Sequence, residues 1–249
     1  MRWGVALVTA LYATTARAHV SPSVDDNNRY VKLTPYADRV RLAYTVFFGD
    51  IPGAQTRPGI DADHDGTIAD TEATAFASKL AAEIAAALEV TLDRVPVATV
   101  WTEVVVGMGS PSVKAGSFSI DLIASYCFGS DRGRHAVHLR DRFRLLHPGE
   151  TEVRLDDSPG ITLDIAHVGP ANDPSHNYRF VGPVGPLSDD GIELVFDVGD
   201  RAPTSGSECG TIPDRPKRLS TGLVVGLAAV LGFVLAAAVA LVRWRKAAR

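Results

Sequence analysis

The sequence predicts a mainly β protein, a β-sandwich, in which one long amphipathic helix follows an acidic loop, with a single transmembrane helix near the C-terminus. Three observations lead to this prediction. Short segments with alternating apolar residues recur along the chain, one alanine-rich segment has an apolar stripe of helical period, and a long uncharged apolar run precedes the last residues.

The alternation of apolar and polar residues is clearest in two segments. In DRVRLAYTVFFGD, the residues Val40, Leu42 and Tyr44 begin an apolar face that continues to Phe48. GSFSIDLIASYCF alternates in the same way from Phe118 onward. A period of two predicts half-buried strands, and short strands separated by Gly, Pro and Asp turns predict a sandwich. Further strands are expected in RYVKLTP, which YAD joins to the next strand as a hairpin, and in VATVWTEVVVG, HAVHLRDRF, ETEVRLD, ITLDIAHV, NYRFVG and GIELVFDV.

One segment departs from the strand pattern and predicts a helix from about Ala69 to Glu89. It is rich in alanine, and four larger apolar residues recur every fourth position. This spacing places them on one face of a helix, which we expect to pack on the sheet. These residues are Phe76, Leu80, Ile84 and Leu88.

Both ends of the chain predict an extracytoplasmic protein held in the cell membrane by one span. Arg2, a short apolar stretch and the small-x-small site ending at Ala18 predict a signal peptide, a retained apolar helix being the alternative. Gly222 to Val242 has no charged or polar side chain and is long enough to span a bilayer. The basic residues that follow at once, from Arg243, favour a cytoplasmic tail.

These features divide the chain into five parts with different expected environments. The Pro-, Ser- and Gly-rich segment before the span has no hydrophobic periodicity and is typical of a stalk. The parts are a signal peptide at 1–18, an extracytoplasmic β-rich domain at 19–200, a stalk at 201–221, a transmembrane helix at 222–242 and a cytoplasmic tail at 243–249. The formal net charge of −4 and the lack of a long basic run within the domain argue against a nucleic-acid partner.

The two cysteines, Cys127 and Cys209, are expected to form a disulfide, because an extracytoplasmic address permits one. Cys127 lies on the more polar face of its strand, so the bond would connect the stalk to the domain. Two unpaired thiols are the alternative.

The acidic loop DADHDGTIADTE, residues 61–72, has the spacing of an EF-hand calcium loop. Calcium takes six to eight oxygen ligands, which a twelve-residue loop supplies at alternate positions, with a glycine at the sharp turn. Gly66 occupies that turn, and Ala69 leaves one place to water. The expected ligands are Asp61, Asp63, Asp65, the backbone carbonyl of Thr67 and the closing Glu72.

A solvated acidic turn at the helix start is the alternative interpretation, but it does not explain the alternating set of carboxylates, which repel one another without a cation. The preceding IPGAQTRPGI contains Pro52 and Pro58 and is not expected to form a full entering helix, and no second loop is present to pair with the first. We therefore expect a weak structural site with a Kd of about 10⁻⁴ to 10⁻³ M, which stays filled outside the cell.

The segments NRY, DRVRLAYTVFFGDIPG, DADHDG and LEVTLDRVPV, with a histidine just after the signal peptide, lie within residues 19–96. In their order they resemble the extracytoplasmic N-terminal domain of bacterial nickel/cobalt transporter-type proteins. The resemblance implies a β-rich module with a calcium-type loop and an accessory role near a membrane metal system. The polytopic transporter part of that family is absent from this sequence, so transport activity is not implied.

Two functional hypotheses follow from these features. The first is a calcium-binding, membrane-anchored interaction module; the second is an accessory protein of nickel, cobalt or copper homeostasis, in which His19 at the mature N-terminus is a metal ligand. Motifs of nucleophilic, zinc-protease and phosphate-binding enzymes are missing, so no enzyme activity is expected, a hydrolase with unrecognised geometry being the alternative. The expected partners are the membrane and another membrane protein, or a second copy through Gly222 and Gly226 of the span.

Overall fold

The structure is a computed structural model that describes residues 25–129, 132–183, 185–202 and 209, and it is mainly β with two sheets. The signal peptide, the transmembrane helix and the cytoplasmic tail expected from the sequence lie outside the described residues, as does most of the stalk. Among the residues described, no helix has the length and apolar character needed to cross a membrane.

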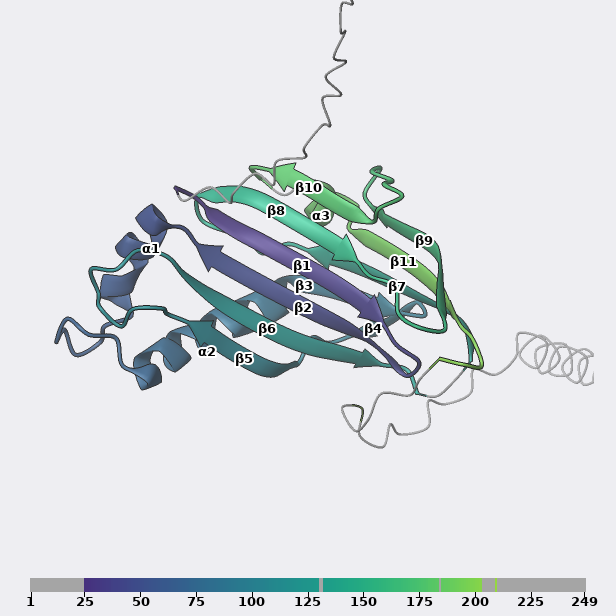
Figure 1. The fold of residues 1–249 in the computed structure, drawn as a ribbon, viewed down its shortest axis with the longest axis horizontal. Coiled ribbons are helices and arrows are strands. Elements are labelled where there is room, and N and C mark those ends of the chain that lie inside the picture. Colours follow the sequence, from purple (N-terminus) through teal and green to yellow (C-terminus); the bar gives the residue numbers. More distant parts are fainter. Residues whose placement is uncertain (1–24, 130–131, 184, 203–208, 210–249) are drawn as a thin grey trace, which may run out of the picture. The chain divides into compact units, whose positions relative to one another are not determined.

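The elements follow one another with short connections (Figure 1). Their bounds are β1 Asn27–Pro35, β2 Arg39–Phe48, α1 Asp50–Thr56, the 3-10 helix η1 Arg57–Gly59, α2 Asp70–Ala87, β3 Leu88–Leu92, β4 Val95–Val97, β5 Trp101–Gly107, β6 Phe118–Cys127, β7 Gly133–Asp141, β8 Pro148–Leu155, β9 Ile161–Val168, β10 Asn177–Val181, α3 Gly185–Asp189 and β11 Ile192–Val198.

The first sheet has six strands in the order β10-β8-β1-β2-β6-β5, as Figure 1 shows. The hairpin expected between the first two strands is confirmed, because β1 pairs with β2 antiparallel and the turn is closed by a hydrogen bond of 2.7 Å from the amide of Tyr36 to the carbonyl of Arg39. The pairing of β1 with β8 is parallel, so the chain crosses to the other sheet before it returns.

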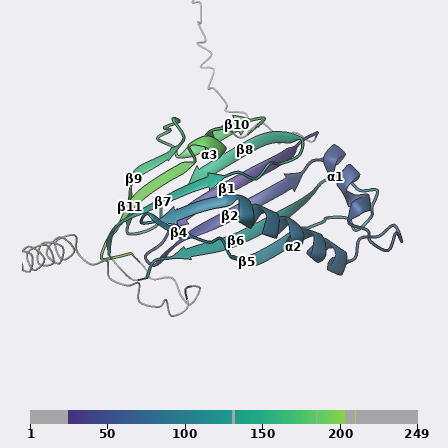
Figure 2. The ribbon, with the colours of Figure 1, turned by 180° about the vertical axis from the view of Figure 1, so that it is seen from behind.

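The second sheet has five strands in the order β4-β3-β7-β11-β9, all antiparallel (Figure 2). The segments predicted as strands after residue 130 all form strands, in β7, β8, β9, β10 and β11. The expected strand in VATVWTEVVVG forms β5 from Trp101 onward, and only its first residue, Val97, belongs to β4. β4 joins the second sheet, while β5 joins the first.

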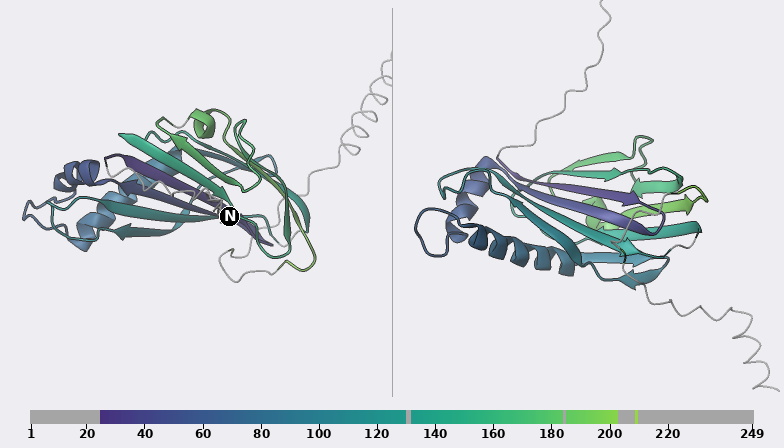
Figure 3. Two further views of the ribbon diagram at one scale, coloured as in Figure 1. Left: turned by 45° about the horizontal axis from the view of Figure 1, so that its top comes forward. Right: turned by 60° about the horizontal axis from the view of Figure 1, so that its bottom comes forward.

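The core lies between the two sheets, which form separate layers in Figure 3. The alternation predicted for β2 and β6 is confirmed, because every second residue of each strand is buried. Tyr44 of β2 and Leu122 of β6 are fully buried, as are Leu139 of β7 and Leu194 of β11 in the other sheet. This two-layer arrangement is consistent with the predicted sandwich.

The long helix is close to its prediction but differs in its end and its buried face. α2 ends at Ala87, and Leu88 turns to extended backbone to begin β3, where it pairs with Asp141. The fully buried helical residues are Ala73, Ala77, Ala81 and Ile84, whereas Phe76 and Leu80 are only partly buried. Small residues therefore bring the helix close to the sheet, and the side-chain nitrogen of Trp101 in β5 donates a hydrogen bond of 2.7 Å to the carbonyl of Ala81.

IPGAQTRPGI forms the seven-residue α1, which the 3-10 helix η1 continues. The segment is therefore no full α-helix, as expected, but it is more helical than its prolines suggest. Pro52 lies in the first turn of α1 and Pro58 in the first turn of η1. Backbone N–H groups in a first helical turn have no acceptor within the helix, so a proline there costs no helical hydrogen bond. The short helix α3 was not predicted from the sequence.

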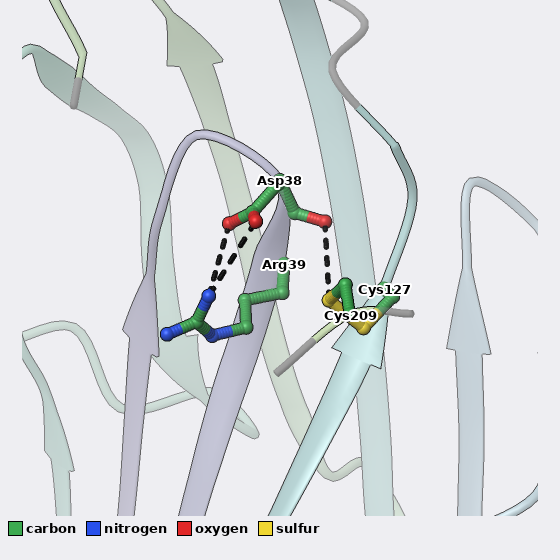
Figure 4. Close-up of a disulfide and its surroundings, with 4 residues drawn as sticks. All are labelled: Asp38, Arg39, Cys127 and Cys209. Atoms are coloured by element: carbon green, nitrogen blue, oxygen red, sulfur yellow. Dashed lines mark hydrogen bonds and ion pairs between the residues drawn. A yellow bond between two sulfur atoms is a disulfide. The ribbon is translucent and has the colours of Figure 1, made fainter. Parts of the chain in front are cut away.

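Cys127 and Cys209 form a disulfide, with the two Cα atoms 5.9 Å apart. Figure 4 shows the bond at the end of β6, beside the turn between β1 and β2. The sulfur of Cys209 lies 3.9 Å from the carbonyl oxygen of Asp38 in that turn. The bond therefore attaches the chain after β11 to the first sheet.

Candidate calcium loop and the adjoining groove

The acidic loop lies between η1 and α2, so it is flanked by helical structure on both sides. The short α1 of seven residues takes the place of a long entering helix. The exit helix α2 has 18 residues and starts within the loop. The local arrangement is therefore helix–loop–helix, closer to an EF-hand than the prolines suggested.

The structure brings three of the predicted ligands together. Asp61, Asp63 and Asp65 each have a carboxylate oxygen within 4.8 Å of the others. Asp61 is only 4% exposed, and its two oxygens accept hydrogen bonds from the amides of Asp65 and Gly66 at 3.2 and 3.0 Å. Gly66 has a φ of +89°, a conformation that glycine adopts without strain. The loop backbone is thus folded around the carboxylates.

Glu72 lies beside this cluster, but its carboxylate bonds to the loop backbone. The carboxylate accepts hydrogen bonds from the amides of Ala62 at 2.7 Å and Ala69 at 2.9 Å. The amides of Ala69 and Ala62 lower the pKa of Glu72, so this side chain is held as an anion. To act as the closing ligand, Glu72 exchanges these hydrogen bonds for the cation.

The fifth predicted ligand, Thr67, connects the loop to another part of the chain. Its own amide donates to Asp65 at 2.7 Å, and Thr67 forms a β-bridge with Ser112. The amide of Ile68 donates to the carbonyl of Pro111 at 2.7 Å. The segment 108–117 between β5 and β6 therefore takes the pairing position that a second loop would occupy.

Arg57 holds this segment in place, and sequence reasoning did not identify it. The side chain is fully buried, and its guanidinium lies 5.4 Å from the ring centre of Phe118. It donates five hydrogen bonds of 2.6–3.1 Å to the backbone carbonyls of Met108, Ser110, Ser112, Gly116 and Ser117. A lone arginine between two prolines carries no sequence signal for this role, because its partners are backbone atoms far along the chain.

A groove of about 900 Å³ adjoins the loop. Its walls come from α1 and η1 on one side, from α2 on another and from the segment 143–147 on a third. Phe48, Phe76 and Leu80 contribute apolar surface, and Leu146 at its edge is 77% exposed. Glu72, a predicted calcium ligand, also lines the groove, so its side chain belongs to both the acidic loop and the groove wall.

A buried charged network joins the two sheets away from the loop. Arg29 of β1 pairs with Asp141 of β7 at 2.6 Å, and the hydroxyl of Tyr44 donates to the same carboxylate at 2.8 Å. Burial raises the pKa of Asp141, against the opposing effect of Arg29, and raises the pKa of Tyr44 well above its usual value. The network pairs Arg29 and Tyr44 with one carboxylate across the core, which is typical of a structural role, although Nε of Arg29 has no hydrogen-bond partner among the described residues.

Three described histidines lie in separate environments. His135 is buried and bonds to Asp93 at 3.0 Å, whereas His138 lies on the other face of β7 and bonds to the carbonyl of Asp190 at 2.9 Å. The two therefore do not share a ligand. His64 occupies the fourth position of the loop with a φ of +60°. His19 lies outside the described residues.

No family model matches the sequence, and no curated protein matches it significantly. The resemblance to nickel/cobalt transporter-type domains therefore stays a prediction.

Proposed function

We propose that the protein is a calcium-binding, membrane-anchored extracytoplasmic module with an interaction or accessory role. One observation carries the calcium part of the proposal: three carboxylates at loop positions 1, 3 and 5 lie within 4.8 Å of one another on a helix–loop–helix. Calcium prefers such hard oxygen ligands, and the repulsion between the carboxylates is relieved by a divalent cation.

The bound cation has a structural role in this proposal. It connects α2, through Glu72, to the loop that pairs with segment 108–117. A site whose Kd is about 10⁻⁴ to 10⁻³ M stays occupied by calcium in an extracellular setting. The site therefore does not act as a sensor of changes in calcium concentration. The cation instead stabilises the helices that line the groove.

The groove supports the interaction role. Its volume of about 900 Å³ lies in the range of ligand pockets, which are concave and mostly apolar. In our proposal it receives apolar side chains of a membrane-protein partner, and the span expected at 222–242 holds the domain next to that partner.

Thermal unfolding of the full-length chain in calcium and in EDTA tests the proposal. At a calcium concentration one hundred times the Kd, binding adds about 2.7 kcal/mol, which raises the Tm by about 5–11 °C for a domain of this size. Asp61→Ala removes the response, because the carboxylate with two backbone hydrogen bonds is lost.

Asp70→Asn is the matched control, since Asp70 is an exposed carboxylate at the start of α2 outside the ligand positions. This variant keeps the calcium response. Equal melting temperatures of the wild-type chain in calcium and EDTA would refute the calcium part of the proposal.

A further inference from the structure

Two histidines and a glutamate lie in one row on the outer face of the second sheet. Glu193 of β11 pairs directly with His138 of β7 on one side and with His167 of β9 on the other. Residues paired across neighbouring strands project from the same face of a sheet, so the three side chains are neighbours. Figure 2 shows these three strands side by side.

The side chains of this row border a hollow of about 410 Å³. His167 Nε2 lies 3.2 Å from a carboxylate oxygen of Glu193, so one pair of the row is in contact. Asp190 and Gly169 complete the rim, and a Cβ atom on Gly169 would lie 3.4 Å from a carboxylate oxygen of Asp190. No lysine or arginine lines this hollow among the described residues. The site combines two imidazoles with two carboxylates.

The hydrogen bonding of this row is incomplete. Nδ1 of His167 is buried and has no hydrogen-bond partner within the described part of the chain. A buried polar atom without a partner is uncommon in folded proteins. Because Nδ1 is closed to solvent, Nε2, which contacts Glu193, is the nitrogen of His167 that is placed to bind a ligand. His138 uses only its Nε2, on the carbonyl of Asp190.

We propose that His138, His167 and Glu193 form a second metal site, for a divalent transition-metal ion of the zinc type. Two imidazoles and one carboxylate are the ligand set of open zinc sites, and imidazole also suits nickel and copper. Among the described residues, ligand atoms lie within 4.8 Å of one another only in the acidic loop, so the ion draws the three side chains of this row together. His138 exchanges its hydrogen bond to Asp190 for the metal, and Glu193 turns from His167 to the ion. The site lies on the second sheet, in residues separate from the calcium loop, and does not depend on the proposed function.

Calorimetric titration of the full-length chain with Zn²⁺, in saturating calcium so that the acidic loop is filled, tests this site. We expect one zinc ion per chain, and a fall in affinity of at least tenfold in His138→Ala and in His167→Ala. Glu193→Gln changes only an exposed side chain on the outer face, so this variant retains the fold. We expect it to weaken zinc binding as well.

Two further variants separate this site from other histidines. His147→Asn is the control, because His147 is exposed, lies outside this row and has a φ of +44° that asparagine tolerates. It binds zinc as the wild-type chain does, and so does His19→Ala. Loss of zinc binding in His19→Ala with retention in the three row variants, or no zinc binding by the wild-type chain, would overturn the proposal.

Discussion

Arg57 is not among the predicted ligands, but it holds the segment that pairs with the acidic loop. Its buried guanidinium satisfies five backbone carbonyls of segment 108–117, and this segment pairs with the acidic loop at Thr67 and Ile68. Among the described residues no carboxylate pairs with this guanidinium, and the carbonyl dipoles around it stabilise the buried charge instead.

Replacing Arg57 tests this dependence. Arg57→Met removes all five hydrogen bonds and leaves partly buried carbonyls without their partner, which costs on the order of 3 kcal/mol in the free energy of unfolding. Calcium affinity falls as well, because the loop loses its attachment. Urea unfolding and a calcium titration measure the two effects.

Arg134→Met is the matched control for that variant. Arg134 is an exposed arginine whose ion pair with Asp164 lies at the surface, so its loss changes stability by about 1 kcal/mol or less. Equal stabilities of the two variants would contradict the role assigned to Arg57.

The individual residues differ in how well the sequence alone predicts them. Asp61, Asp63 and Asp65 could be predicted, because their spacing is local and a single loop brings them together. Arg57 could not, since its partners lie more than fifty positions away. The row of His138, Glu193 and His167 could not either, because it depends on the register of three strands.

At the scale of elements, α1 packs on segment 108–117 by a close backbone contact. A Cβ atom on Gly53 would lie 2.5 Å from the carbonyl oxygen of Gly116, which leaves no room for a side chain. This contact fixes the start of the helix–loop–helix on the first sheet.

Gly53→Ala tests the contact. Alanine favours a helix by about 1 kcal/mol over glycine, but the overlap with Gly116 costs about 1–3 kcal/mol, so the variant is destabilised or at best unchanged. Gly59→Ala is the control, because a Cβ there meets no atom within 4 Å. Chemical denaturation separates the two, and a Gly53→Ala protein clearly more stable than Gly59→Ala would contradict this packing.

The disulfide is the second element-scale feature with a measurable consequence. It closes a separation of 82 residues, from Cys127 to Cys209. In the chain-entropy account, a loop of that length stabilises the folded state by about 4 kcal/mol. Cys127→Ser combined with Cys209→Ser therefore lowers the free energy of unfolding by about that amount.

A reductant supplies the control for the disulfide. Dithiothreitol lowers the Tm of the wild-type chain toward that of the double variant and has no effect on the variant itself. A wild-type Tm that is insensitive to full reduction would contradict a stabilising bond.

The elements themselves could mostly be predicted from periodicity. The alternation in β2 and β6 was sufficient, because one face of each strand is buried. α1 escaped prediction because prolines in a first helical turn resemble breakers. The end of α2 at Ala87 could not be predicted, because Leu88 fits the helical spacing and the strand alternation equally well. Its pairing with Asp141 places it in β3.

At the scale of the whole molecule, the two sheets hold the acidic loop and the histidine row in different places on one scaffold. The loop adjoins the edge of the first sheet through segment 108–117, and the row lies on the outer face of the second. Arg29, Asp141 and Tyr44 tie the two sheets together through the core. This arrangement allows each site to be altered with the other intact.

Calcium titration of the full-length chain by isothermal calorimetry tests the central claim most directly. Our account predicts one calcium ion per chain, bound with a Kd of about 10⁻⁴ to 10⁻³ M in wild-type protein and in Asp70→Asn, and not measurably in Asp61→Ala. No binding heat in the wild-type chain, or the same heat in Asp61→Ala, would contradict it.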